Sequence, residues 1–220
     1  MSAGHLHINE KPFRERRLLQ VLCACYAIIW IVAAVDPVKR SDWLLENLLV
    51  FVSVPTLIFT YRRLPLSDSA YVLVFLFLVM HAVGAHYTYA EVPLGYWLKE
   101  TFHLERNHFD RIVHFSFGVM AYPIQEILIR ITKVRGFWAL LLPAAIIVSF
   151  SGFFEILEAI IAMLVNPELG AAYLGLQGDV WDAQKDMALA ILGAALAMSF
   201  GLRRAYERSR SSVTPSSSAQ

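Results

Sequence analysis

The feature that most constrains this chain is a series of apolar segments, each long enough to cross a membrane as a helix. A helix of about 20 apolar residues spans the hydrocarbon core of a bilayer, and it satisfies its own backbone hydrogen bonds there. The segments of this kind are residues 18–35, 44–60, 70–89, 112–131, 137–164 and 186–202. The sequence therefore predicts an all-α membrane protein, built as a bundle of six transmembrane helices.

The charged residues favour the same fold class. They make up 17% of the chain, whereas soluble domains carry about 25%. The formal net charge is only +1, and the basic residues are spread over short connecting segments. The chain therefore lacks a basic domain of the kind that nucleic-acid binding requires. We expect the lipid bilayer, and no nucleic acid, to be its main partner.

The basic residues also predict which way the helices cross the membrane. Lysine and arginine favour the cytoplasmic side. With six spans, the two termini and the connections after the second and fourth spans share one side, and all four segments are basic. We therefore expect both termini to be cytoplasmic. Residues 1–17 form a cytoplasmic segment, residues 18–202 the transmembrane domain, and residues 203–220 a basic, Ser-rich cytoplasmic tail without stable structure.

Three carboxylates at the start of the sixth span are the strongest sign of a functional site. Asp179, Asp182 and Asp186 are spaced three and four residues apart, so they share one face of a helix. Such carboxylates repel one another unless a cation, a proton or basic side chains offset their charge. Asp179 alone is equally well explained as a helix N-cap. The spacing of the three residues nevertheless indicates a polar site.

Polar residues of three other spans are expected at the same depth. A helix rises about 1.5 Å per residue, which fixes the depth of each side chain. The residues that this rule places near the outer ends of the third, fourth and fifth spans are His86, Asp110, His114, Glu155 and Glu158. Carboxylates within spans are costly and tend to mark function. We therefore predict one site just below the outer surface, formed by four spans.

The residue types suit a metal ion or proton transfer. Carboxylates with one or two imidazoles bind divalent ions of borderline hardness such as Zn, Mn or Fe, and the same groups can transfer protons. The expected metal ligands are His86, His114, Glu155, Asp182 and Asp186. The expected catalytic residues are Asp110, His114, Glu155, Glu158, Asp182 and Asp186. The cofactor is then a divalent metal ion, although the sequence does not select which one.

Three classes of function fit such a site. The first is an enzyme, assisted by metal, that acts on a lipid-linked or envelope substrate, with aromatic residues at the outer surface forming a wall for a lipid or isoprenoid tail. The second is a non-catalytic binder or permease for a cation or an amphiphile. The third is a structural network of polar groups that joins the helices. The chain has no Ser-nucleophile elbow, P-loop, HExxH or CxxC motif, so the chemistry of those motifs is disfavoured.

Three stretches of the chain resemble the YjdF family of bacterial inner-membrane proteins. They are MHAVGAHYTYAEVP at residues 80–93, RNHFDRIVHF at residues 106–115 and GDVWDAQKDM at residues 178–187. The resemblance extends over roughly residues 18–202. It implies a multi-pass protein of the bacterial inner membrane and supports the predicted topology and site, but it implies no particular reaction.

The chain also bears a more distant resemblance to VanZ-like membrane proteins, which are associated with glycopeptide-antibiotic resistance. The positions that match the pattern of that family are Asp110, His114, Phe115, Glu155, Asp186 and Gly193. Two positions depart from it: Ala190 stands where an asparagine is expected, and Glu158 stands where that family often has glutamine. A shared ligand or reaction is therefore not implied.

Overall fold

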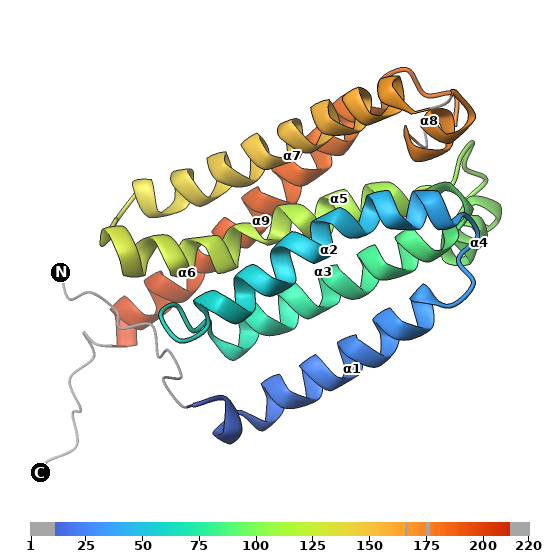
Figure 1. Cartoon of the computed structure of the whole chain (residues 1–220). Helices are drawn as coiled ribbons and strands as arrows, with labels where there is room; N and C mark the ends of the chain where they lie inside the picture. The colour runs from blue at the N-terminus through green and yellow to red at the C-terminus, as the bar shows by residue number, and fades with distance from the viewer. Residues whose placement is uncertain (1–11, 166, 175–176, 212–220) are drawn as a thin grey trace, which may run out of the picture.

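The structure is a computed structural model that describes residues 12–165, 167–174 and 177–211, with the side chains of residues 172, 173 and 201–211 left out. Within these residues the chain forms helices and no strands (Figure 1). The long helices are α1 (Arg17–Ala34), α2 (Arg40–Thr60), α3 (Asp68–Tyr87), α5 (Phe109–Val119), α6 (Ala121–Thr132), α7 (Trp138–Leu164) and α9 (Asp182–Ser211). The short elements are η1 (Phe13–Glu15), η2 (Tyr89–Glu91), α4 (Pro93–Thr101) and α8 (Pro167–Leu174).

Five helical segments of the described residues are long and apolar enough to cross a membrane. Four are α1, α2, α3 and α7, and the fifth is Phe109–Thr132, in which α5 and α6 follow each other through Met120. These segments match the first five predicted spans, so the prediction of an all-α membrane protein is confirmed. Helix α9 starts at Asp182 and continues to Ser211, past the predicted end of the sixth span. The terminal segments 1–11 and 212–220 lie outside the described residues.

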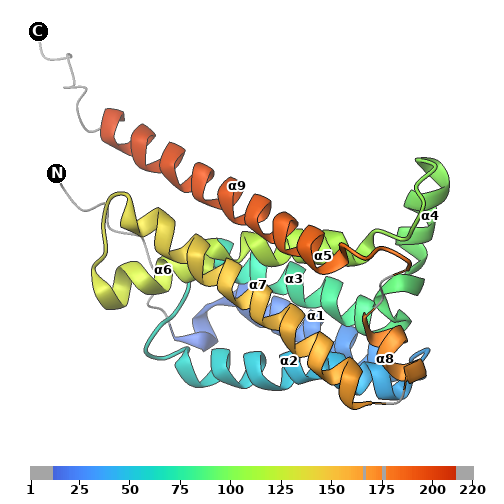
Figure 2. The same ribbon diagram turned by 90° about the horizontal axis from the view of Figure 1, so that it is seen from above.

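The long helices lie side by side, and the chain reverses direction from each span to the next, with α5 and α6 together forming one span (Figure 1). Helix α1 begins and α9 ends at the end of the bundle where α2 connects to α3 and α6 connects to α7 (Figures 1 and 2). The opposite end carries α4 and α8. Helix α9 packs against α5 and α7, and α3 packs against α1 and α5. Helices α5 and α9 therefore run parallel, and both start at the end that carries α4 and α8.

The contact between α5 and α9 depends on glycine. A Cβ atom added to Gly118 would lie 2.2 Å from the carbonyl oxygen of Ala190, and one added to Gly193 would lie 2.2 Å from that of Phe115. Both distances are too short for any side chain, so only glycine allows the two backbones to come this close. Small residues of this kind are the usual means by which membrane helices pack tightly.

The distribution of side chains is the reverse of that in a soluble protein. Polar residues such as Asp42, Asn47, His81, Glu126 and Asp186 are among the most completely buried side chains. Large apolar residues on the long helices face outward along their whole length. An apolar exterior of this extent marks a surface that contacts membrane or another protein, and intramembrane polar groups turn toward the interior of the bundle. Burial thus supports the assignment to a membrane.

Candidate functional site

The parallel helices α5 and α9 bring two pairs of polar residues face to face. Asp110 and His114 are four residues apart on α5, and Asp182 and Asp186 are four residues apart on α9. Each pair therefore lies on one face of its helix. His114, Asp182 and Asp186 are buried, and Asp110 is half-buried. The site lies one to two turns from the start of both helices, at the end of the bundle that carries α4 and α8.

Asp110, His114 and Asp186 form a group that could hold one metal ion. Each offers one ligand atom, and the three atoms all lie within 4.8 Å of one another. The Nε2 atom of His114 lies 3.5 Å from Oδ1 of Asp110. Asp186 is only 2% exposed, and its Oδ1 atom has no hydrogen-bond partner among the described residues. A buried, unsatisfied carboxylate oxygen is unfavourable, so the site needs a cation or a proton.

Helix α7 adds two further carboxylates to this group. Oε1 of Glu155 lies 3.5 Å from Nε2 of His114, and this oxygen has no hydrogen-bond partner among the described residues. Glu158 lies one turn further along α7 and is close enough to Asp110, Glu155 and Asp186 to interact with them electrostatically. The structure thus brings together residues from α5, α7 and α9, as the sequence predicted for the fourth, fifth and sixth spans.

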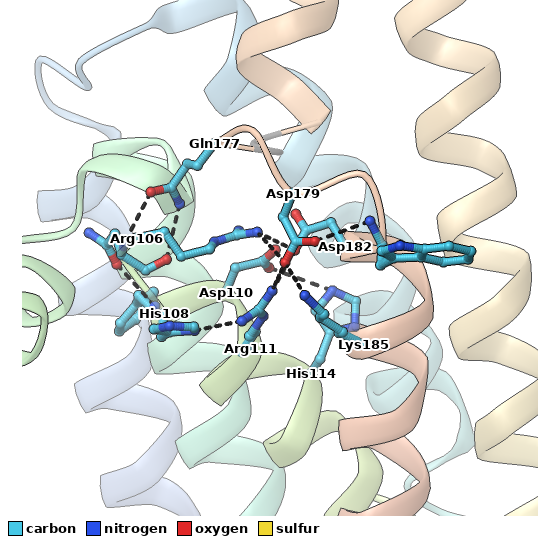
Figure 3. Close-up of polar contacts among 12 residues, drawn as sticks. Arg106, His108, Asp110, Arg111, His114, Gln177, Asp179, Asp182 and Lys185 are labelled. Carbon is cyan, nitrogen blue, oxygen red and sulfur yellow. Dashed lines mark hydrogen bonds and ion pairs between the residues drawn. The ribbon is translucent and has the colours of Figure 1, made fainter. Parts of the chain in front are cut away.

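Two arginines form ion pairs with Asp182. Arg106 precedes α5, and Arg111 lies in its first turn. Nη1 of Arg106 donates to Oδ1 of Asp182, and Nη2 of Arg111 lies 3.3 Å from the same oxygen (Figure 3). Both Arg106 and Asp182 are almost completely buried. Guanidinium groups that occupy a carboxylate leave it poorly placed to bind a cation. The geometry of Asp182 is that of a buried ion pair, it lies outside the group of three, and its role as a metal ligand stays a prediction.

His86 does not join the group of three either, and its assignment as a metal ligand stays a prediction. Its Nδ1 atom lies 3.0 Å from the carbonyl oxygen of Ala33 in α1, and its ring packs edge-on against Tyr87. Depth in the membrane was predicted from residue number alone. The rotation of α3 about its own axis turns His86 toward α1, and residue number does not give that rotation.

Asp179 joins α5 to the start of α9. Its Oδ2 atom accepts hydrogen bonds from Arg111 at 2.5 Å and Lys185 at 2.6 Å, and it lies 3.9 Å from Arg106 (Figure 3). Its Oδ1 atom accepts one from the backbone N–H of Trp181 at 3.1 Å. The hydrogen bond from Lys185, with those from Trp181 and Arg111, holds the pKa of Asp179 well below its usual range. The carboxylate of Asp179 therefore joins α5 to α9 through ion pairs. It does more than cap the start of α9, which was the alternative explanation of this residue.

A second connection lies on the other side of Arg106. Oε1 of Gln177 accepts from the backbone N–H of Asn107 at 2.9 Å, and its Nε2 atom donates to the carbonyl oxygen of Asn107 at 3.0 Å (Figure 3). The Asn107 side chain donates to the carbonyl oxygen of Val92 at 3.0 Å. These bonds fix the segment before α5 to the segment before α9, and they set the position of Arg106.

His108 supports Arg111 as a neutral imidazole. Nη1 of Arg111 lies 3.0 Å from Nδ1 of His108. Because a guanidinium group can only donate, Nδ1 must be the unprotonated nitrogen. Burial, together with the positive charges of Arg111 and Arg106, lowers the pKa of His108 below its usual value. The ring is therefore a hydrogen-bond acceptor for Arg111 at neutral pH.

The connection through Asp179 predicts a specific pH dependence. Because the pKa of Asp179 is lowered in the folded protein, its contribution to stability is fully present above the unfolded value of about 3.9. It is lost only as the pH falls toward the lower folded value. Asp179→Asn should therefore lower the melting temperature in detergent by a constant amount between about pH 5 and pH 8, and by progressively less below about pH 4. A difference that is greatest in acid would contradict this.

Two carboxylates of α2 were missed in the sequence. Asp42 and Glu46 are almost completely buried and four residues apart, and Glu46 interacts electrostatically with Asp42 and Asp110. The predicted second span begins at residue 44, whereas α2 already begins at Arg40, so Asp42 lies inside the helix. The signal was present, because two acids at a spacing of four at the start of an apolar run would share a helix face.

Comparisons with known proteins agree with the fold and its burial pattern. The model of the family DUF2238, described as predicted membrane protein, matches residues 18–207 of the chain. The inner membrane protein YjdF of Escherichia coli (strain K12) is 35% identical to the chain over 186 residues, which are 83% of this chain and 88% of that protein. No solved structure matches the chain. The resemblance to VanZ-like proteins is not tested by these matches and stays a prediction.

Proposed function

Because the chain belongs to the DUF2238 family of predicted membrane proteins, which includes YjdF, we propose that it is a metal-assisted enzyme of the bacterial inner membrane. Its metal centre would be held between α5 and α9, and its substrate would be lipid-linked or part of the cell envelope. The observation that carries the proposal is the buried carboxylate of Asp186. One of its oxygens has no hydrogen-bond partner among the described residues, although potential ligand atoms of Asp110 and His114 lie within 4.8 Å.

The proposed topology has six spans with both termini in the cytoplasm. Helix α9 supplies the sixth span, since it packs against α5 and α7 and carries exposed apolar side chains such as Leu192, Leu196 and Phe200. The basic residues of the connections after α2 and α6 are exposed at the end of the bundle opposite α4 and α8. The positive-inside rule places that end in the cytoplasm. The candidate site then lies close to the periplasmic surface.

The ligand set favours a catalytic ion over a structural one. Asp110, His114 and Asp186 are three protein ligands, and three ligands leave a coordination position for water or substrate. A divalent ion there would supply Lewis acidity or an activated water. Glu155, whose Oε1 atom lies 3.5 Å from His114, is placed to accept or donate the proton of such a reaction. Arg106, Asp182 and Arg111 hold α5 and α9 in register beside the ion.

Asp186→Asn should remove the metal without unfolding the protein. Purified wild-type protein, exposed to Zn²⁺ or Mn²⁺ and then desalted, should retain about one ion per chain by elemental analysis. The variant should bind more than about 100-fold more weakly, because even residues behind the ligands are worth about 10- to 100-fold. Asp36→Asn, a change in an exposed aspartate of the α1–α2 connection, is the matched control. Equal metal contents in wild type and Asp186→Asn would refute the centre.

A permease for a cation or proton is the second candidate, and one observation favours it. Further carboxylates lie beyond the proposed centre. Glu158 interacts electrostatically with Glu46, and Glu46 interacts with Asp42. Rows of buried carboxylates can carry ions or protons through a membrane protein. Cation or proton flux in proteoliposomes distinguishes the two functions. Flux that depends on Asp186, in a protein that retains no metal after desalting, would favour the permease.

A further inference from the structure

Helix α4 differs from the long helices in its direction. Figure 2 shows α4 crossing the direction of the long helices at one end of the bundle and projecting to one side of it. The chain enters α4 after α3 and η2 and leaves it for α5, so α4 lies at the level where two membrane spans end and begin. A helix at that level and in that direction lies in the plane of the membrane surface.

The sequence of α4 is amphipathic. Leu94, Trp97 and Leu98 recur with a spacing of three and four residues, which places them on one face of the helix. The two charged residues of the helix, Lys99 and Glu100, lie outside this apolar face. Leu94 and Trp97 are 51% and 57% exposed, and Leu98 is half-buried. The apolar face of α4 is therefore largely uncovered by the protein, although apolar surface is unfavourable in water.

A contact at the first turn of α4 fixes the helix in this orientation. A Cβ atom added to Gly95 would overlap the side chain of Asn107, so glycine allows this close approach. Asn107 is completely buried, donates to the carbonyl oxygen of Val92 and accepts from the backbone N–H of Phe109. The side of α4 that carries Gly95 is thus joined to the start of α5, and the exposure of the apolar face follows from this fixed orientation.

We propose that α4 is an interfacial helix, which lies in the surface of the bilayer with Leu94 and Trp97 against the lipid chains and Glu100 toward water. Two observations favour lipid over a protein partner. Trp97 and Trp181, which precedes α9, are exposed at the same end of the bundle, and tryptophan is enriched where membrane meets water. Helix α4 also has only nine residues, whereas a stable protein interface uses about 20–30 on each side. The inference does not depend on the metal centre.

The experiment is electron paramagnetic resonance of nitroxide labels on the full-length protein in liposomes of phosphatidylethanolamine and phosphatidylglycerol. Cys23 and Cys25, which are exposed, are first replaced by alanine, so that each label attaches to one introduced cysteine. Collisions with oxygen, which concentrates in lipid, and with a water-soluble nickel complex give the depth of each label. Labels introduced through Leu94→Cys and Trp97→Cys should favour oxygen and lie about 5–10 Å into the boundary between headgroups and acyl chains. The label of Glu100→Cys should favour the nickel complex.

Two further labels calibrate the measurement. Phe153→Cys replaces an exposed residue in the middle of α7, and its label should report the interior of the lipid. Arg135→Cys replaces an exposed residue of the connection between α6 and α7, and its label should report water. The preference of the Leu94 and Trp97 labels for oxygen should lie between these two references, since the interface lies between lipid interior and water.

The inference is overturned if the labels of Leu94→Cys and Trp97→Cys are as accessible to the nickel complex as that of Arg135→Cys, because α4 then lies in water. It is also overturned if neither oxygen nor the nickel complex reaches these labels, because a second copy of the chain then covers the apolar face. A difference in depth between Trp97→Cys and Glu100→Cys, with Trp97→Cys the deeper, is the result that supports an interfacial helix.

Discussion

Gly118→Ala should destabilise the protein by about 2–3 kcal/mol and weaken metal binding, although Gly118 is not part of the candidate site. The added Cβ atom would lie 2.2 Å from the carbonyl oxygen of Ala190. The obstacle is backbone, which cannot rotate away as a side chain can, and forcing extra atoms into a packed interface typically costs about 1–3 kcal/mol. Helices α5 and α9 must move apart to accept the methyl group.

Moving α5 and α9 apart should also displace the metal ligands, because Asp110 and His114 are on α5 and Asp186 is on α9. Three ligand atoms that lie within 4.8 Å cannot all keep their places when the helices shift. Thermal melting in detergent measures the loss of stability, and metal titration measures the loss of affinity. Gly193→Ala should act in the same way, since its Cβ atom would meet the carbonyl oxygen of Phe115 at 2.2 Å.

Gly152→Ala on α7 is the matched control. Its nearest neighbour would be the sulfur of Met187 at 3.4 Å, which is the end of a flexible side chain. Alanine is also favoured over glycine within a helix by about 1 kcal/mol, so this variant should be as stable as wild type or slightly more stable. If Gly118→Ala and Gly152→Ala behave alike, close backbone contact between α5 and α9 does not hold the site together.

Asp182→Leu should produce the largest loss of stability of any single change at the site, about 3–5 kcal/mol. The carboxylate of Asp182 is 3% exposed and is shared by Arg106 and Arg111. Removing one partner of a buried ion pair is costly, because the remaining charge stays in a medium of low dielectric constant. The measurement is thermal or denaturant unfolding in detergent, at a pH near neutrality.

The double variant Arg106→Leu/Asp182→Leu tests whether the pair itself is the cause. Its destabilisation should be smaller than the sum of the two single changes by about 1 kcal/mol or more, the coupling expected for residues in direct contact. Apolar replacement of both partners of a buried pair is often tolerated. Additive effects would mean that Arg106 and Asp182 act separately. Asp182→Leu protein that remains folded should still bind the metal ion, in contrast to Asp186→Asn.

The spans and part of the site could be predicted because they follow from local pattern. An apolar run of about 20 residues forms a helix in lipid whatever its neighbours are. A spacing of four residues places Asp110 with His114, and Asp182 with Asp186, on one face each. The alternation of direction then brings the starts of the fourth and sixth spans to the same end. These three rules were sufficient to place Asp110, His114 and Asp186 in one larger predicted site, in which Asp110 was expected as a catalytic residue and not as a metal ligand.

The remaining features depend on contacts that no local pattern contains. Residue number gives the depth of His86 but not the rotation of α3, which turns the ring toward Ala33. The role of Asp182 depends on Arg106 and Arg111, which lie between the third and fourth predicted spans. Asn107, next to Arg106, is held by Gln177, 70 residues away along the chain. The burial of Glu46 depends on the packing of α2 inside the bundle.

The most direct test of the metal centre is anomalous X-ray diffraction from crystals of the full-length protein grown with Zn²⁺ or Mn²⁺. The account predicts one strong peak between α5 and α9, about 2.0–2.2 Å from Nε2 of His114 and from a carboxylate oxygen of Asp110 and of Asp186. A peak at Asp182 or at His86, or no peak near Asp186 in protein that binds the ion in solution, would contradict it.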